Sequence, residues 1–86
     1  MKKEKIRVLI ADDHTILREG ICSLLEDEEH IELVGEAADG EEAVAKVDKL
    51  KPDVVIMDIS MPKMNGIQAT EIIKKKHPEV KVLILS

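Results

Sequence analysis

The sequence predicts an α/β fold in which a parallel β-sheet is covered by helices. Apolar runs rich in valine and isoleucine occur four times, at residues 6–11, 31–37, 53–58 and 80–86. Between them lie segments with apolar residues at helical spacing, at residues 15–28, 40–50 and 66–77. Each connection is long enough for a crossover between parallel strands, so the alternation indicates the order β-α-β-α-β-α-β.

The predicted strands are nearly continuous in their apolar character. The run "IRVLIA" (6–11) is interrupted only by Arg7, "IELVGEA" (31–37) partly alternates, and "DVVIMD" (53–58) and "VKVLILS" (80–86) are again almost wholly apolar. Such runs are typical of strands that are buried on both faces of a parallel sheet. Right-handed connections would then place helices on both faces of an open sheet.

The predicted helices carry apolar stripes and recognisable ends. Asp39 before Glu42, and Asn65 before Gln68, have the spacing of capping boxes, and Pro78 is expected to end the third helix after His77. The stripes consist of Ile16, Leu17, Ile21, Leu24 and Leu25 in the first helix, Ala43, Val44, Val47 and Leu50 in the second, and Ile67, Ile72 and Ile73 in the third.

Composition narrows the class of protein. The chain has 86 residues, 44% of them hydrophobic and 36% charged, which fits one small soluble domain. Two features argue against nucleic-acid binding. The net charge of −5 does not favour contact with phosphates, and without aromatic residues no side chain is able to stack on bases. No apolar run is long enough to span a membrane, and we expect a cytoplasmic protein. Cys22 is alone, and we expect it to be a small apolar residue on a helix.

Two of the predicted strands end in carboxylates. Asp12 and Asp13 follow the first strand, and Asp58 ends the third. If these strands are neighbours, their carboxyl ends meet at one edge of the sheet, where ligands of such folds bind. Three carboxylates at that distance would repel one another, and a divalent cation such as Mg²⁺, which prefers oxygen ligands, would relieve the repulsion. The alternative is that Asp12 and Asp13 cap the following helix and that Asp58 merely begins a turn.

Three motifs, taken together, resemble the receiver domain of bacterial two-component response regulators. They are "VLIADDH" (8–14), "VVIMDISMPKMNG" (54–66) and "VLILS" (82–86), and they extend over essentially the whole chain. The acidic pair followed by His14, with "GEAADGEEAV" (35–44), is most similar to the subgroup with LuxR- or NarL-type DNA-binding domains. The resemblance implies a flavodoxin-like sheet with the strand order 2-1-3-4.

The resemblance also implies roles for individual residues. Asp58 matches the acceptor of a phosphoryl group from a sensor histidine kinase, Asp13 a direct Mg²⁺ ligand, and Asp12 the acid that usually binds the ion through water. The carbonyl of Ser60 matches a main-chain metal ligand, and Ser86 matches the hydroxyl that turns toward the phosphoryl group. Pro62 and Gly66 match loop residues, whereas His14 is expected beside the site or at the surface. A receiver of this kind is a signalling module and not an enzyme.

The same family comparison predicts what the chain lacks. A receiver normally has a fifth strand, a lysine that contacts the phosphoryl group and further helices, so we expect residues 1–86 to form the N-terminal part of a receiver domain. The uncovered last strand would be an apolar edge, and one sheet face would lose its covering helices. Both features predict association with a second copy, through the last strands or through the uncovered sheet faces, most simply as a homodimer. Two alternatives remain, an inert half-domain that self-associates and an unrelated flavodoxin-like binding or enzyme domain without a Gly-rich cofactor loop.

Overall fold

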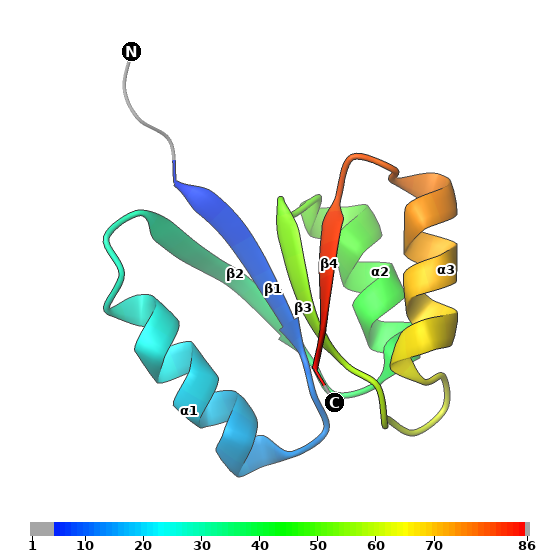
Figure 1. Ribbon diagram of the computed structural model, residues 1–86, viewed down its shortest axis with the longest axis horizontal. Coiled ribbons are helices and arrows are strands. Elements are labelled where there is room, and N and C mark those ends of the chain that lie inside the picture. Colours follow the sequence, from blue (N-terminus) through cyan, green and yellow to red (C-terminus); the bar gives the residue numbers. More distant parts are fainter. Residues whose placement is uncertain (1–4, 86) are drawn as a thin grey trace.

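The computed structural model describes residues 5–85, in which a sheet lies between helices (Figure 1). The elements of this part of the chain follow the predicted order. Their bounds are confirmed to within one or two residues, with the largest difference at α1, which ends at Glu26 and not at residue 28. The strands are β1 (Ile6–Ala11), β2 (Ile31–Ala37), β3 (Val54–Asp58) and β4 (Lys81–Leu85), and the helices are α1 (Thr15–Glu26), α2 (Gly40–Leu50) and α3 (Gly66–Lys76).

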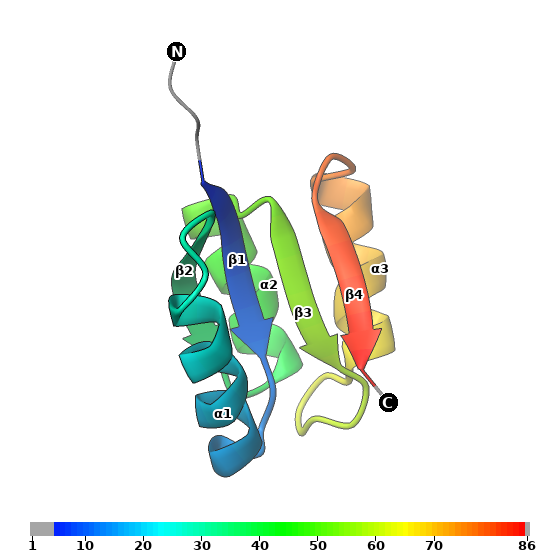
Figure 2. The ribbon, with the colours of Figure 1, turned by 60° about the vertical axis from the view of Figure 1, so that its left-hand side comes forward.

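The sheet is parallel and has the strand order β2-β1-β3-β4, which confirms the order that the resemblance implied. Helix α1 covers one face, and α2 and α3 cover the other (Figure 1). Strands β1 and β3 are neighbours in the middle of the sheet, and Ala11 of β1 is paired with Met57 of β3. Figure 2 shows both strands ending at the same edge of the sheet. This pairing brings together the residues that follow each strand.

The core is divided in two by the sheet. Leu9 of β1 and Met57 of β3 belong to the cluster under α2 and α3, whereas Ile10 belongs to the cluster with Cys22 of α1. Leu9, Ile10 and Met57 have no exposed surface. Because successive strand residues point to opposite faces, both faces must be apolar, and this explains the continuous apolar runs. Cys22 is buried, as predicted for a small apolar residue.

The N-termini of α2 and α3 begin at the capping residues that the sequence indicates. At α3 the capping box is complete, since Asn65 Oδ1 accepts from the Gln68 N–H and Gln68 Oε1 accepts from the Asn65 N–H. At α2 the Asp39 side chain accepts from the Glu42 N–H at 2.8 Å as predicted. The return bond differs, because Glu42 Oε1 accepts from the Ala38 N–H, one residue before the cap. The N-termini of both helices are therefore fixed near the carboxyl ends of β1 and β3.

The helices are short, with 12 residues in α1 and 11 each in α2 and α3. Helix α3 ends at Lys76 with His77 as its C-cap, directly before Pro78 and one residue before the predicted end at His77. Among residues 5–85 we find no helix with the length and apolar character that a membrane crossing requires.

Strand β4 forms an open edge of the sheet in the described part of the chain. Three of its apolar side chains face outward to a large degree, with exposed fractions of 57% at Leu83, 38% at Ile84 and 36% at Leu85. An apolar edge strand with free main-chain groups is able to pair with another strand. The predicted apolar edge strand is thus present in the described part of the chain.

Candidate functional site

Three carboxylates converge where β1 and β3 end. Asp12 and Asp13 follow β1 directly, and Asp58 is the last residue of β3. Together with His14 they offer one ligand atom each, and these four atoms all lie within 4.8 Å of one another. The sheet therefore brings together the three acids that the sequence placed at two separate strand ends.

Asp12 and Asp58 are held in different ways. The Asp12 side chain is only 1% exposed, and its Oδ1 accepts from the His14 N–H at 2.8 Å. The Asp58 side chain is 14% exposed, and its Oδ1 accepts from the Ser60 N–H at 3.3 Å. The second carboxylate oxygen of each, Oδ2, is buried without a hydrogen-bond donor. Buried polar atoms in proteins almost always have partners, so these two oxygens indicate a place for a ligand.

The helix-capping alternative for Asp12 and Asp13 is wrong. The N-cap of α1 is His14, whose own side chain makes no capping bond, and Asp12 bonds His14 and no residue within the helix. Asp58 does begin a turn, as the alternative had it, because its Oδ1 accepts from the Ser60 N–H in the loop after β3. This bond uses only one of its two carboxylate oxygens. Asp12 therefore orients His14, and neither of the two acids after β1 caps the helix.

His14 occupies a more central place than the sequence indicated. Its ring nitrogen Nδ1 lies 3.0 Å from Asp12 Oδ1, 3.2 Å from Asp13 Oδ1 and 3.5 Å from Asp58 Oδ2. The hydrogen bond with Asp12, followed by the charge of Asp13, raises the pKa of His14. The ring is 65% exposed, so it approaches the acids from the solvent side. The adjacent "DDH" letters were the available signal, but they do not define the side-chain direction.

Gly66 lets the loop after β3 pack against the strand that it leaves. Its N–H donates to the Ile59 carbonyl at 2.8 Å. A Cβ at this position would lie 2.1 Å from the carbonyl oxygen of Asp58 and 3.0 Å from the Cα of Ile59. Only glycine fits this approach, and the loop is thereby held next to Asp58. Pro62 lies in the same loop.

Arg18 of α1 is a residue that sequence reasoning missed. Its Nη1 donates to the main-chain carbonyl of Asp12 at 2.5 Å, and its Nε donates to Glu36 Oε1 at 3.0 Å. The side chain is only 17% exposed. Arg18 therefore ties the peptide after β1 to β2 and places a positive charge beside the acids. No spacing rule in the sequence reveals this contact, since it depends on how α1 packs.

Lys63 stands apart from the acids. The Lys63 Nζ lies 3.7 Å from Asp39 Oδ2 at the start of α2, and so its amine is directed to that carboxylate. Ser86 lies outside the described residues. Leu85, the residue before Ser86, lies close to Asp58, because the Leu85 carbonyl accepts from the N–H of Ile59 at 3.2 Å.

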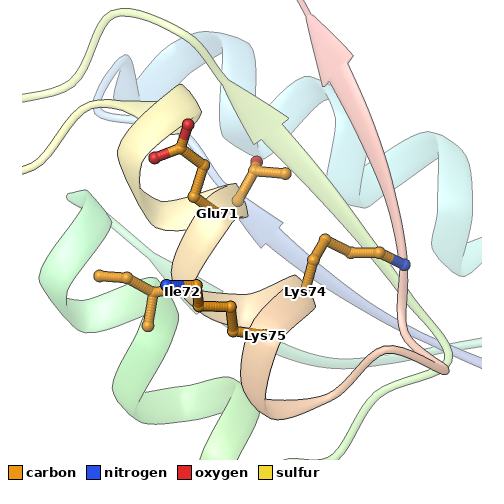
Figure 3. Close-up of a pocket in the computed structure, with 5 residues that line it drawn as sticks. Glu71, Ile72, Lys74 and Lys75 are labelled. Carbon is orange, nitrogen blue, oxygen red and sulfur yellow. The ribbon is translucent and has the colours of Figure 1, made fainter.

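A hollow of about 680 Å³ lies along α3 and is separate from the acids. Figure 3 shows Lys74 extended toward β4, where its Nζ bonds the carbonyls of Pro78 and Val80. The remaining lining residues are also from α3, and none is a carboxylate of the cluster. The hollow therefore shares no residue with the carboxylate cluster.

Known proteins match both the sequence and the fold. The family model described as the response regulator receiver domain matches residues 8–86. The response regulator protein VraR of Staphylococcus aureus is 51% identical over 81 residues, which cover 94% of this chain and 39% of VraR. The chain spans less than two fifths of the length of the first curated relatives that it matches, with shares of 36% and 39%.

Solved structures agree with this assignment. The signal receiver domain of the NarL regulator from Mycobacterium tuberculosis has a TM-score of 0.90 and 36% identity, covering 94% of this chain and 65% of that one. The CheX-CheY-BeF3-Mg complex from Borrelia burgdorferi has a TM-score of 0.88 and 32% identity, covering 94% of this chain and 61% of that one. The chain therefore belongs to the receiver domains of two-component response regulators, among those of LuxR- and NarL-type regulators.

Proposed function

We propose that this part of a receiver domain accepts a phosphoryl group on Asp58 from a phosphohistidine of a sensor histidine kinase, with Mg²⁺ as the cofactor. The observation that carries the proposal is the convergence of Asp12, Asp13 and Asp58 within 4.8 Å, with buried oxygens that lack donors. Membership of the receiver family supports it. The cytoplasm, where such a kinase domain would meet it, is the expected location.

The donor set fits Mg²⁺. Carboxylate and carbonyl oxygens are the ligands that this ion prefers, usually one or two carboxylates with several waters. We assign Asp13 and Asp58 as direct ligands, Asp12 as a ligand through water and the Ser60 carbonyl as a main-chain ligand. The unpartnered Asp12 Oδ2 and Asp58 Oδ2 would gain the partners that they lack. When bound, the ion would neutralise charge on the transferring phosphoryl group.

The protein's part in the reaction is to hold the nucleophile in place. Asp58 attacks phosphorus with a carboxylate oxygen, so an O–P bond forms while the P–N bond of the phosphohistidine breaks and the freed imidazole takes up a proton. Strand β3 is paired on both sides and restrains the Asp58 main chain, and the Ser60 N–H holds Oδ1. The role of Ser86, a hydroxyl that would turn toward the phosphoryl group, stays a prediction.

Intact mass spectrometry tests this function. With Mg²⁺ and a small acyl phosphate donor, we expect the chain to gain the mass of one phosphoryl group, and we expect Asp58→Asn to abolish the gain. Asp53→Asn is the matched control. Asp53 directly precedes β3, at the opposite end of the strand from Asp58, and its Oδ2 accepts from the Arg7 N–H. An adduct that persists in Asp58→Asn would contradict Asp58 as the acceptor. The absence of any adduct although Mg²⁺ binds would contradict the proposal and favour the inert half-domain.

In a whole regulator, we propose that the phosphorylated receiver controls transcription through a separate DNA-binding domain. This part of the proposal rests on membership of the LuxR- and NarL-type group. The chain itself acts as a signalling module, and its acceptor carboxylate is consumed and regenerated by phosphorylation and hydrolysis.

We also propose that this chain pairs with a second copy through β4. The Lys81 N–H donates to the Asp53 carbonyl and the Leu85 carbonyl accepts from the Ile59 N–H, so these residues direct their main-chain groups to β3. The groups of Val82 and Ile84 therefore point to the open edge, because these directions alternate along a strand. An antiparallel pair centred on residue 83 would join the edge groups of both copies by main-chain hydrogen bonds.

Light scattering after size exclusion tests the pairing. We expect a dimer that becomes a monomer in Ile84→Pro, because proline removes an N–H that points to the edge and leaves the bonds to β3 in place. Ile84 belongs to neither of the two core clusters, so we expect the change to leave the core in place. A wild-type chain that stays monomeric at high concentration would contradict this assembly without affecting the phosphorylation proposal.

A further inference from the structure

We propose that His14 supplies a nitrogen ligand to the cation site, so that the site also accepts first-row ions that favour imidazole, such as Co²⁺ and Zn²⁺. The inference rests on the cation site of the proposed function and extends the range of ions that this site binds. It concerns a side chain that was expected only beside the site or at the surface.

The positions of the four ligand atoms carry the proposal. Metal–ligand bonds of about 2.1 Å put adjacent ligand atoms about 3.0 Å apart in octahedral geometry and about 3.4 Å apart in tetrahedral geometry. The Nδ1 of His14 lies 3.0, 3.2 and 3.5 Å from oxygens of Asp12, Asp13 and Asp58. His14 thus stands to the two direct ligands, Asp13 and Asp58, at the spacing of neighbouring ligands around one ion, and to Asp12 at hydrogen-bond distance.

A second observation points to a ligand at the same place. The Asp12 side chain is 1% exposed, and its Oδ2 has no hydrogen-bond partner. Its other oxygen, Oδ1, is bonded both to the His14 N–H at 2.8 Å and to the His14 ring at 3.0 Å. One buried carboxylate therefore orients the histidine and retains a free oxygen in the same cluster. Because a carboxylate only accepts, Nδ1 carries the hydrogen of the 3.0 Å bond, and a cation bound to Nδ1 would replace that proton, which is released to solvent.

The main chain makes His14 a fixed ligand position. The residue is the N-cap of α1 in an extended conformation, and the Arg18 N–H donates to its carbonyl at 2.9 Å. The ring itself is 65% exposed, so the nitrogen opposite Nδ1 is able to bond water. A cation could enter from this side without any rearrangement of the core.

The kind of ion follows from the chemistry of the donors. Carboxylates and waters suit Mg²⁺, whereas neutral imidazole suits Zn²⁺ and other transition ions. Without His14, the three carboxylates would select among cations by charge and size alone. With His14, the same cluster becomes a mixed oxygen and nitrogen site, and the affinity for Co²⁺ and Zn²⁺ rises relative to that for Mg²⁺.

Binding measurements on His14→Ala test this inference. We expect the affinities for Zn²⁺ and Co²⁺ to fall at least about tenfold, the scale on which lost metal-site partners act. The affinity for Mg²⁺ should change by less than about threefold, since Mg²⁺ keeps its oxygen ligands. His77→Ala is the matched control. His77 lies outside the cluster, and its Nε2 is hydrogen-bonded to Asp48 Oδ1 at 2.7 Å.

Nitrogen NMR of the imidazoles gives a readout independent of affinity. On Zn²⁺ addition, the Nδ1 resonance of His14 should shift while that of His77 stays in place. Equal losses for Mg²⁺ and Zn²⁺ in His14→Ala, or an unshifted His14 signal, would overturn the inference. Tighter binding of every ion in His14→Ala would also overturn it and would make the ring a competitor of the cation.

Failure of the proposed function gives a different pattern. If the wild-type chain binds Zn²⁺ through His14 but neither binds Mg²⁺ nor becomes phosphorylated on Asp58, the function is wrong and the nitrogen ligand stands. If Mg²⁺ binds and Asp58 is phosphorylated while His14→Ala leaves the preference among ions unchanged, only the inference on His14 fails. Circular dichroism of both histidine variants checks that they remain folded.

Discussion

Replacement of Gly66 by alanine is expected to destabilise the chain by about 3 kcal/mol, the upper range of the cost of overpacking. The added Cβ would lie 2.1 Å from the carbonyl oxygen of Asp58 and 2.9 Å from its carbonyl carbon. Both are main-chain atoms of a paired strand, so neither is able to move aside cheaply. The movement that relieves the clash would displace Asp58, and phosphorylation should fall together with stability.

Urea denaturation followed by circular dichroism measures this effect, since the chain has no aromatic residue that would report by fluorescence. Gly20→Ala is the matched control. Nothing lies within 4 Å of a Cβ at Gly20, which is in the middle of α1. Alanine should raise the free energy of unfolding there by about 0.5–1 kcal/mol. If Gly66→Ala were as stable as the wild type, the packing described for the loop would be wrong.

Saturation with Mg²⁺ is expected to stabilise the wild-type chain strongly. At a concentration about 100-fold above the dissociation constant, the free energy of unfolding should rise by about 2.7 kcal/mol, because the ion binds only the folded state. Asp12→Asn should lose most of this gain, since a neutral amide attracts the cation less. Without Mg²⁺ the same variant should be more stable than the wild type, because it removes one of three crowded negative charges.

Thermal unfolding with and without Mg²⁺ measures both effects. Asp27→Asn serves as the control, because Asp27 is the C-cap of α1 and lies outside the cluster, and it should keep the full response to Mg²⁺. A wild-type chain whose stability does not depend on Mg²⁺ would show that the acids tolerate one another without an ion.

Much of the fold could be predicted because it depends on local rules. Apolar runs marked the strands, and Asn65 with Gln68 marked the start of α3 by a spacing that is visible in the sequence. The convergence of the acids at the ends of β1 and β3 followed from parallel pairing. Ser60 and Ser86 keep their roles as proposals, the second because it lies outside the described residues.

What escaped prediction depends on side-chain direction. His14 and Arg18 both lie at the start of α1, and their contacts are determined by how that helix packs on β1 and β2. The return bond of Glu42 shows the same limit on a smaller scale, since it reaches Ala38 and not the predicted Asp39 N–H. Spacing in the sequence identifies the residues that are able to bond, but not the atom that each one reaches.

The proposed function requires that the ends of β1 and β3 share one cation through Asp13 and Asp58. Paramagnetic Mn²⁺, added to an isotope-labelled sample, measures this most directly, because it broadens the amide signals of residues near the ion. If the site is shared, the signals of Asp13 and Asp58 should broaden together, at the same Mn²⁺ concentrations, and recover together when excess Mg²⁺ is added. Broadening at one strand end only, or at two different concentrations, would contradict a shared site.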